Sequence, residues 1–115
     1  MNAINLMLDS RVEGDWAVVD VKGEIDLHTA PKLRERMTEL VEQGQRRVIL
    51  NMEALDFMDS TGLGVLIGSL KRLKENEGTL ALVAPQHPIQ RVLSVTGLTK
   101  VFPIHDTVEE AMAAG

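Results

Sequence analysis

The chain has 115 residues, of which 44% are hydrophobic, 25% are charged and 3% are aromatic. This length and apolar content fit a single domain with one hydrophobic core over residues 1–115 and exclude a pair of domains. The formal net charge of -5 would on average repel a nucleic-acid backbone, and so few aromatic side chains leave little to stack on bases.

Two strands, joined as a hairpin, are predicted at the start of the chain. Residues 3–9 have a weak strand pattern, and Trp16–Lys22 has a strong one that is rich in β-branched residues. The turn-prone residues 13–15 separate the two strands. Residues 23–26 then interrupt the pattern, so we expect the second strand to end at Lys22.

An amphipathic helix is predicted next. Thr29 is the candidate N-cap, and Pro31 is tolerated because it falls in the first turn. Gly44 is expected to end this helix, since glycine commonly follows the last helical turn. Its apolar side chains recur at helical spacing and form one stripe, which consists of Leu33, Met37, Leu40 and Val41.

A short apolar run predicts the central strand of the sheet. Arg47–Met52 lies between polar flanks, as expected for a strand that helices cover on both faces. Residues 53–59 are expected to form a loop. A second helix is predicted from Ser60 to about Glu77, closed by Gly78, with an inward face made of Leu63, Leu66, Ile67, Leu70 and Leu73.

The remaining elements are short. We expect a strand at Leu80–Ala84, a helix at Ile89–Val95, a strand at Val101–Ile104 and a C-terminal helix that begins with a capping box between Thr107 and Glu110. The order ββαβαβαβα predicts an α/β fold, because parallel neighbouring strands need helical crossovers. We therefore expect a mixed sheet of about four to five strands with about four helices packed on it.

The segment Phe57–Gly64, with the sequence FMDSTGLG, joins the predicted central strand to the long helix. Open α/β sheets place functional loops at such junctions. Ser60 is predicted at or just before the first helical turn, where its hydroxyl can cap exposed backbone amides. One interpretation is therefore a simple N-cap serine.

The long helix also contains glycines that need an explanation. Each interior glycine, at positions 62, 64 and 68, costs about 1 kcal/mol relative to alanine. A partner protein could approach the small residues closely, or another helix of the same domain could fill the space, and their spacing leaves both open. The strip of residues that recurs at helical spacing comprises Thr61, Gly64, Val65, Gly68 and Arg72.

A phosphoryl group on Ser60 could act as a binding switch. It would meet the positive end of the helix and its free amides, so the domain could accommodate it without unfolding. It would also add about one to two negative charges next to Asp59 and close to Asp26, at the edge of the strip. Desolvating this charge against a partner without a matching cation would lower the affinity roughly a thousandfold or more.

Four segments of the sequence together resemble a known family. They are Gly23–Asp26, Thr29–Leu33, Phe57–Gly64 and Thr96–Phe102. These segments are similar to those of the anti-anti-sigma factors, which are single-domain bacterial STAS proteins, and the resemblance covers nearly the whole chain. The DSTGLG sequence in this setting is typical of the phosphorylatable members.

The resemblance implies a STAS fold and a partner-switching cycle. The unphosphorylated protein would bind an anti-sigma factor and thereby free a sigma factor for transcription. The anti-sigma factor, an ATP-dependent serine kinase, would phosphorylate Ser60 and end the complex, and a PP2C-type phosphatase would restore the serine. The resemblance further implies that Asp26 lies near Ser60 and helps in recognition, and that the contact surface is shaped by Asp59, Thr61, Gly62 and Gly64.

An enzyme is the first alternative. Ser60 would be the nucleophile, with a base drawn from the three histidines, His28, His87 and His105. A hydrolase elbow reads G-x-S-x-G, however, and Met58 occupies the place of its first glycine. No oxyanion loop is evident, so the sequence favours a protein that is not an enzyme.

Two further alternatives concern binding. Gly62-x-Gly64 at a helix start could hold a nucleotide, but Ile67 stands where the third glycine of that motif would be. A STAS protein could also be a scaffold in a signalling complex or a subunit of a transport system, because the same fold serves all these roles.

No cofactor, metal or small-molecule substrate is expected. The histidines lack metal-ligand spacing, and the chain has no cysteine for a thiolate site or a disulfide. The first residues lack the basic and then apolar pattern of a signal peptide, and every apolar run is far shorter than the roughly 20 residues of a membrane span. We therefore expect a cytoplasmic protein-interaction switch without a membrane or nucleic-acid partner.

Overall fold

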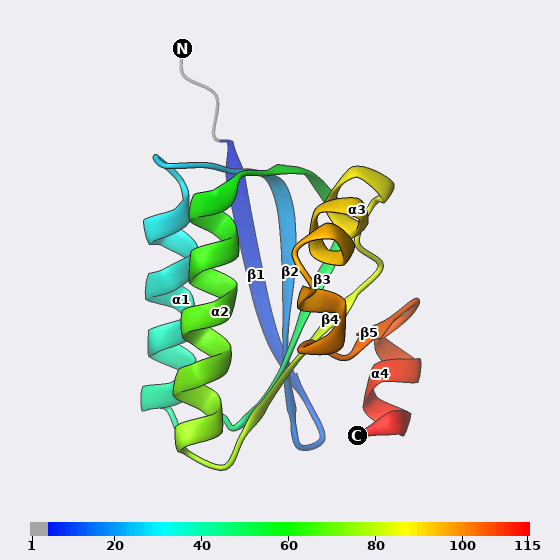
Figure 1. The fold of residues 1–115 in the computed structure, drawn as a ribbon. Coiled ribbons are helices and arrows are strands. Elements are labelled where there is room, and N and C mark those ends of the chain that lie inside the picture. The colour runs from blue at the N-terminus through cyan, green and yellow to red at the C-terminus, as the bar shows by residue number, and fades with distance from the viewer. Residues whose placement is uncertain (1–4) are drawn as a thin grey trace.

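The computed structural model describes residues 5–115, which form a five-stranded mixed sheet with α-helices packed on it (Figure 1). The strand order is β1-β2-β3-β4-β5; β1 and β2 are antiparallel, and the other neighbours are parallel. This confirms the predicted α/β class and element order. The strands are β1 Leu6–Glu13, β2 Trp16–Ile25, β3 Arg47–Met58, β4 Thr79–Val83 and β5 Ile104–His105. The α-helices are α1 Ala30–Glu42, α2 Ser60–Glu75, α3 His87–Val95 and α4 Val108–Ala114.

Strand β2 is longer than predicted, because the expected interruption after Lys22 is a bulge. Its pairing with β3 shifts register between Gly23 and Glu24 and then continues to Ile25. Gly23 has a φ of 113°, and a Cβ there would lie 2.1 Å from the carbonyl oxygen of Asn5, so only glycine fits. Residues 3 and 4 of the predicted first strand lie outside the described residues.

Strand β3 also extends beyond its predicted end, so the loop expected over residues 53–59 was wrong. The strand continues to Met58 with buried Leu55 and Met58, while Glu53 before them and Asp56 between them are exposed. The register shifts in the β2 ladder break the simple alternation of buried and exposed residues. Polar residues inside a bulged strand therefore resemble a loop in the sequence.

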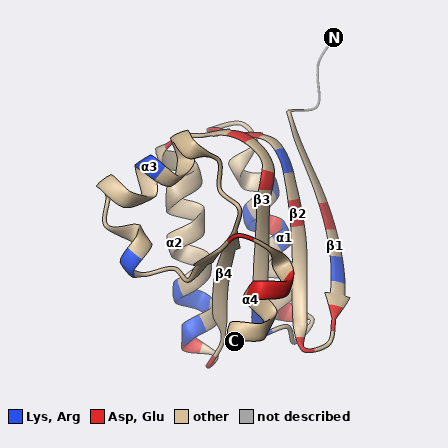
Figure 2. Cartoon of the chain, turned by 90° about the vertical axis from the view of Figure 1, so that its right-hand side faces the viewer, with Lys and Arg blue, Asp and Glu red and all other residues tan. Residues whose placement is uncertain are grey.

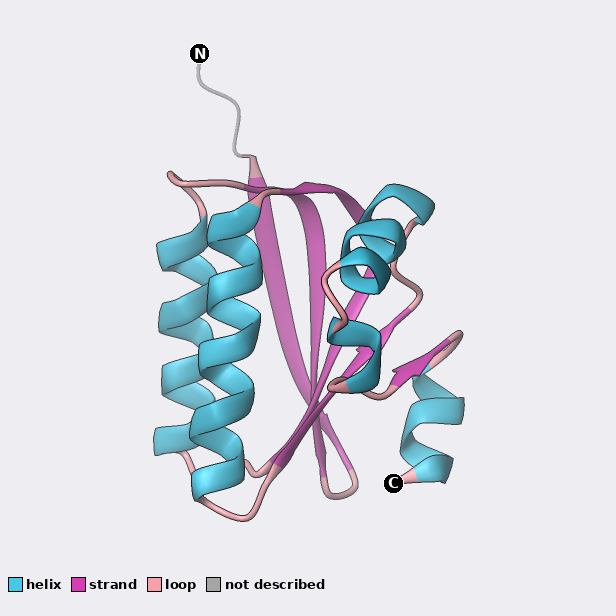
Figure 3. Ribbon diagram, viewed as in Figure 1, coloured by secondary structure: helices cyan, strands magenta, loops and turns pink. Residues whose placement is uncertain are grey.

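Both faces of the sheet carry helices. Figure 3 shows α1 and α2 side by side against the sheet. Apolar residues of α1, α2 and α3 share one core with Val48, Leu50 and Met52 of β3. A second core on the other face joins α4 to Ile49, the intervening residue of the same strand. The alternation along β3 thus confirms the predicted central strand covered on both sides.

Two details of the helices differ from the prediction. Thr29 occupies the predicted N-cap position of α1, but its hydroxyl donates to the carbonyl oxygen of Glu24 (2.9 Å) and accepts from the N–H of Asp26 (2.9 Å), so within residues 5–115 it makes no capping hydrogen bond. Ile67 of α2 is 47% exposed and does not face inward, whereas Val65 is buried at 3%. The buried stripe of α2 passes through Leu66. Ile67 is rotated by about 100° from Leu66 around the helix axis, which places it outside this stripe.

The last strand is shorter and later than predicted. Residues Leu98–Lys100 form a 3-10 helix, η1, and only Ile104–His105 pair with β4 as strand β5. Phe102, inside the predicted strand, inserts into the core at 2% exposure. Half of the predicted capping box of α4 is confirmed, because the hydroxyl of Thr107 accepts from the N–H of Glu110 at 3.0 Å, whereas the described residues show no return bond from the Thr107 N–H to the Glu110 side chain.

Charges at two helix ends complement the helix dipoles. Acidic residues Glu109 and Glu110 occupy the first turn of α4, and basic residues Arg72 and Lys74 occupy the last turn of α2 (Figure 2). Each placement puts a charge opposite to the partial charge of that helix end. Among the helices of residues 5–115, none has the length and apolar composition needed to cross a bilayer.

Candidate functional site

The carboxyl ends of β2 and β3 bring the candidate residues together. Ile25 and Met58, the last residues of these parallel strands, are paired, and the N–H of Asp59 donates to the carbonyl oxygen of Ile25 at 3.1 Å. Asp26 and Asp59 each follow directly, so both carboxylates lie at the edge of the sheet where α2 begins. Ser60, the first residue of α2, lies at the same edge, as the resemblance implied for Asp26 and Ser60.

Asp59, and not Ser60, caps helix α2. Its Oδ1 accepts from the N–H groups of Thr61 (2.8 Å) and Gly62 (3.3 Å). The side chain of Ser60 is exposed, and within residues 5–115 its hydroxyl makes no hydrogen bond. The interpretation of Ser60 as a simple N-cap is therefore wrong. A hydroxyl at the helix entrance is left accessible for modification.

Asp26 organises the turn between β2 and α1. Its Oδ1 accepts from the N–H groups of His28 (2.9 Å) and Thr29 (3.0 Å) and lies 3.2 Å from the Thr29 hydroxyl. The hydrogen bond from the Thr29 backbone, and after it the one from His28, lower the pKa of Asp26 below its ordinary value. Asp26 therefore presents a negative charge at this edge at neutral pH.

The lowered pKa of Asp26 predicts a specific dependence of stability on acid. The charged carboxylate stabilises the folded state above the pKa of the unfolded chain, and this contribution is lost as the pH falls through the lower folded pKa. We expect Asp26→Asn to lose less stability than the wild type on acidification over that window. Denaturant unfolding at a series of acidic pH values measures this, and parallel curves for the two proteins would contradict it.

Two large apolar side chains flank this edge, and the sequence prediction did not assign them a role. Leu27, next to Asp26, is 69% exposed, and Phe57, three residues before Ser60, is 49% exposed. Exposed apolar side chains that adjoin charged groups are typical of contact surfaces. Leu27 stands alone among polar neighbours in the sequence, which is the one signal that could have indicated it.

The strip of small residues on α2 divides into a buried and an open part. Gly62 is buried, and a Cβ there would lie 2.4 Å from Cγ of Met58 and 2.8 Å from Cγ2 of Ile25. A Cβ at Gly64 or Gly68 would meet nothing within 4 Å. The alternative in which another helix of the same domain fills the strip is therefore wrong for Gly64 and Gly68.

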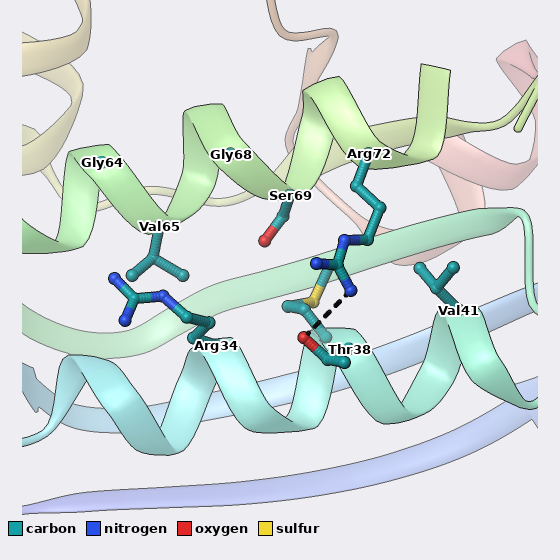
Figure 4. Close-up of a pocket in the computed structure, with 9 residues that line it drawn as sticks. Arg34, Thr38, Val41, Gly64, Val65, Gly68, Ser69 and Arg72 are labelled. Atoms are coloured by element: carbon teal, nitrogen blue, oxygen red, sulfur yellow. Dashed lines mark hydrogen bonds between the residues drawn. The ribbon is translucent and has the colours of Figure 1, made fainter. Parts of the chain in front are cut away.

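The other residues of the strip share one side of α2 but differ in burial. Val65 is buried, Thr61 is half-buried and Arg72 is exposed. Gly64, Gly68 and Arg72 line a groove between α1 and α2 (Figure 4). Val65 lines the same groove although it is largely buried, so only Gly62 must act on a contact surface from beneath.

The histidines do not form a catalytic arrangement with Ser60. His28 lies in the Asp26 turn, His87 begins α3 and His105 lies in β5. Over residues 5–115 none of them is hydrogen-bonded to the Ser60 hydroxyl, so a base for nucleophilic attack is not in place. The same residues contain no cluster of three or more ligating side chains that could hold a metal ion.

Comparison with known proteins agrees with this arrangement. A family model for the STAS domain matches residues 7–111. The chain belongs to the STAS domain family. This STAS domain is 33% identical over 106 residues to the anti-sigma-B factor antagonist of Staphylococcus aureus, an alignment that covers 92% of this chain and 98% of the relative.

Solved structures of other STAS domains share the fold. The crystal structure of an anti-sigma factor antagonist from Mycobacterium paratuberculosis has a TM-score of 0.88 at 28% identity and covers 99% of this chain and 97% of that one. SpoIIAA in its unphosphorylated form gives 0.80 at 30% identity, covering 93% and 92%. Phosphorylated SpoIIAA, a cell fate determinant of Bacillus, gives 0.74 at 29%, covering 95% and 97%. Both forms of SpoIIAA therefore share the fold of this STAS domain.

Proposed function

We propose that this STAS domain, acting as a single domain over its 115 residues, is an anti-sigma factor antagonist. Its unphosphorylated form binds an anti-sigma factor and frees a sigma factor, and phosphorylation of Ser60 abolishes the binding. The observation that carries the proposal is the exposed Ser60 hydroxyl at the start of α2, next to two carboxylates and without a hydrogen bond to any of residues 5–115. The names of the S. aureus and M. paratuberculosis relatives support the same class of function.

The proposed contact surface runs from the sheet edge along α2. Exposed Leu27 and Phe57 supply apolar area at its start. The remaining proposed contact residues differ in position: Asp26, Asp59 and Thr61 lie at the helix entrance, Gly64, Val65, Gly68 and Arg72 continue along the groove, and buried Gly62 supports the surface from below. Aromatic and aliphatic anchors next to polar groups are what a specific protein interface needs.

The charges at the helix entrance explain why a phosphoryl group would end the complex. In residues 5–115 neither Asp26 nor Asp59 has an ion-pair partner. Asp59 already occupies two of the amides of the first turn of α2, so these do not neutralise an added phosphate. Phosphoserine at position 60 would create a third negative group at one spot, which a docked partner could not desolvate without a large cost.

The cycle needs two enzymes besides this protein, which is not itself an enzyme in the proposal. The anti-sigma factor is the serine kinase that uses ATP, and a PP2C-type phosphatase regenerates Ser60. No cofactor, small-molecule substrate or direct nucleic-acid contact is required of this chain. Because sigma factors act in transcription, we place the cycle in the bacterial cytoplasm.

Phosphate mapping tests the proposal. Incubation with the purified anti-sigma kinase of the same organism and ATP should place one phosphate on Ser60, located by mass spectrometry of peptides. Thr61→Ala should still be labelled, because the neighbouring hydroxyl is only half-exposed and takes no part, whereas Ser60→Ala should not. A phosphate on another residue, or no phosphate at all, would refute the mechanism.

A further inference from the structure

Two arginines, one from each helix, line the groove between α1 and α2. Arg34 comes from α1 and Arg72 from α2, and Figure 4 shows both side chains directed into the groove. Within residues 5–115 neither guanidinium pairs with a carboxylate, although the chain carries 17 acidic residues. The one hydrogen bond of either side chain there joins Nη1 of Arg72 to Oγ1 of Thr38 at 3.4 Å. The groove is thus a local positive site on an acidic protein.

The size of the groove limits what can enter it. Its volume is about 140 Å³. A cavity of about 150 Å³ takes a group the size of benzene, so this groove has room for one side chain and not for a helix. Figure 4 shows the hydroxyl of Ser69 directed between the two arginines, which adds a hydrogen-bonding group to the positive charges.

The wall formed by α2 is open to close approach from outside. Alanine at position 64 or 68 would favour the helix without meeting any atom within 4 Å, so the fold itself does not require these glycines. Their absent side chains leave the groove accessible along two turns of the helix. A backbone carrying the inserted side chain could therefore lie directly against α2.

We propose that this groove receives the carboxylate side chain of an Asp or Glu of the anti-sigma factor. This inference rests on the proposed function, and it names the chemical group of the anti-sigma factor that the groove binds. The planar guanidinium of each arginine matches a carboxylate with two parallel N–H donors. A neutral or basic side chain would leave both guanidiniums without a partner on docking, at a cost that disfavours it.

Arg72 and the phosphorylated serine lie far apart along α2 and act separately on the same partner. Twelve residues of helix separate Ser60 from Arg72, and at 1.5 Å per residue this is roughly 18 Å. Exposed charges interact weakly beyond a Debye length of about 8 Å at physiological salt. Arg72 therefore does not neutralise a phosphate on Ser60, and it contributes affinity that the switch does not control.

Calorimetry with the purified anti-sigma factor of the same organism tests the groove. Arg34→Ala and Arg72→Ala should each weaken binding about 10- to 100-fold, as expected for a charge-assisted hydrogen-bonded pair. Lys71→Ala removes the same charge from an exposed position of α2 outside the groove and should change the affinity less than about twofold. The melting temperatures of the variants should match the wild type, since both arginines are exposed.

Double-mutant cycles identify the inserted group. Each exposed Asp or Glu of the anti-sigma factor is changed to its amide and combined with Arg72→Ala, and one of them should show a coupling of about tenfold or more. Three results would each contradict the proposed carboxylate site. They are wild-type affinity in both arginine variants, a loss of affinity in Lys71→Ala equal to that in the arginine variants, and the absence of any coupled acidic residue. Ser60→Asp in the same assay separates the two proposals: if it binds as the wild type does, the switch fails while the groove is judged by its own variants.

Discussion

Phosphorylation of Ser60 should weaken binding to the anti-sigma factor by roughly a thousandfold, because a dianion beside two carboxylates must be desolvated in the interface. The fold should survive. A phosphate at a helix N-terminus gains about 0.3–1 kcal/mol from the dipole, which is of the same order as its repulsion from the half-buried Asp26 and Asp59. The effect on folding is therefore small compared with the effect on binding.

Three serine variants separate charge from other causes. Ser60→Asp should bind poorly, and Ser60→Ala should bind as the wild type does but resist release by kinase and ATP. Ser94→Asp, the same change at an exposed position of α3, should leave the affinity unaltered. Calorimetry gives the affinities, and thermal melts show whether each variant is folded. Equal affinities for Ser60→Asp and Ser60→Ala would contradict a switch that acts through charge.

The order of the elements could be predicted from the sequence, because hydrophobic spacing along each helix and strand is a local property. The lengths of β2 and β3 could not. Gly23 looks like a strand end in the sequence, yet it allows the close contact with Asn5 that lets the bulged strand continue. A bulge depends on the neighbouring strand, so its residues resemble a turn until the pairing is known.

The sequence predicted where the candidate site lies, but it did not predict the role of every residue in the site. Asp and Ser are both good N-caps, so the sequence could not decide which of Asp59 and Ser60 caps α2. The structure assigns the cap to Asp59 and leaves the hydroxyl of Ser60 without a partner among residues 5–115. Arg34 was missed altogether, because its relation to Arg72 arises only when α1 packs beside α2.

Glycines at positions 62 and 68 should respond in opposite directions to the same substitution. Gly62→Ala places a methyl group against Met58 and Ile25, both closer than 3 Å, and overpacking of this kind costs about 1–3 kcal/mol. This exceeds the gain of about 1 kcal/mol from replacing a helical glycine, because two buried neighbours must both move. Gly68→Ala meets no atom within 4 Å and should keep that gain.

Thermal unfolding measures this contrast. For a domain of this size 1 kcal/mol corresponds to a shift of about 3–6 °C, so Gly62→Ala should melt below the wild type and Gly68→Ala at or above it. If Gly68→Ala melted well below the wild type, the groove would be filled from within the domain.

Gly68→Glu tests the same position through binding. It should fold and yet bind the anti-sigma factor poorly, because it puts bulk and negative charge where the partner's carboxylate is proposed to sit. The melting temperatures thus show that the fold requires Gly62, and the affinities show that the partner requires Gly68.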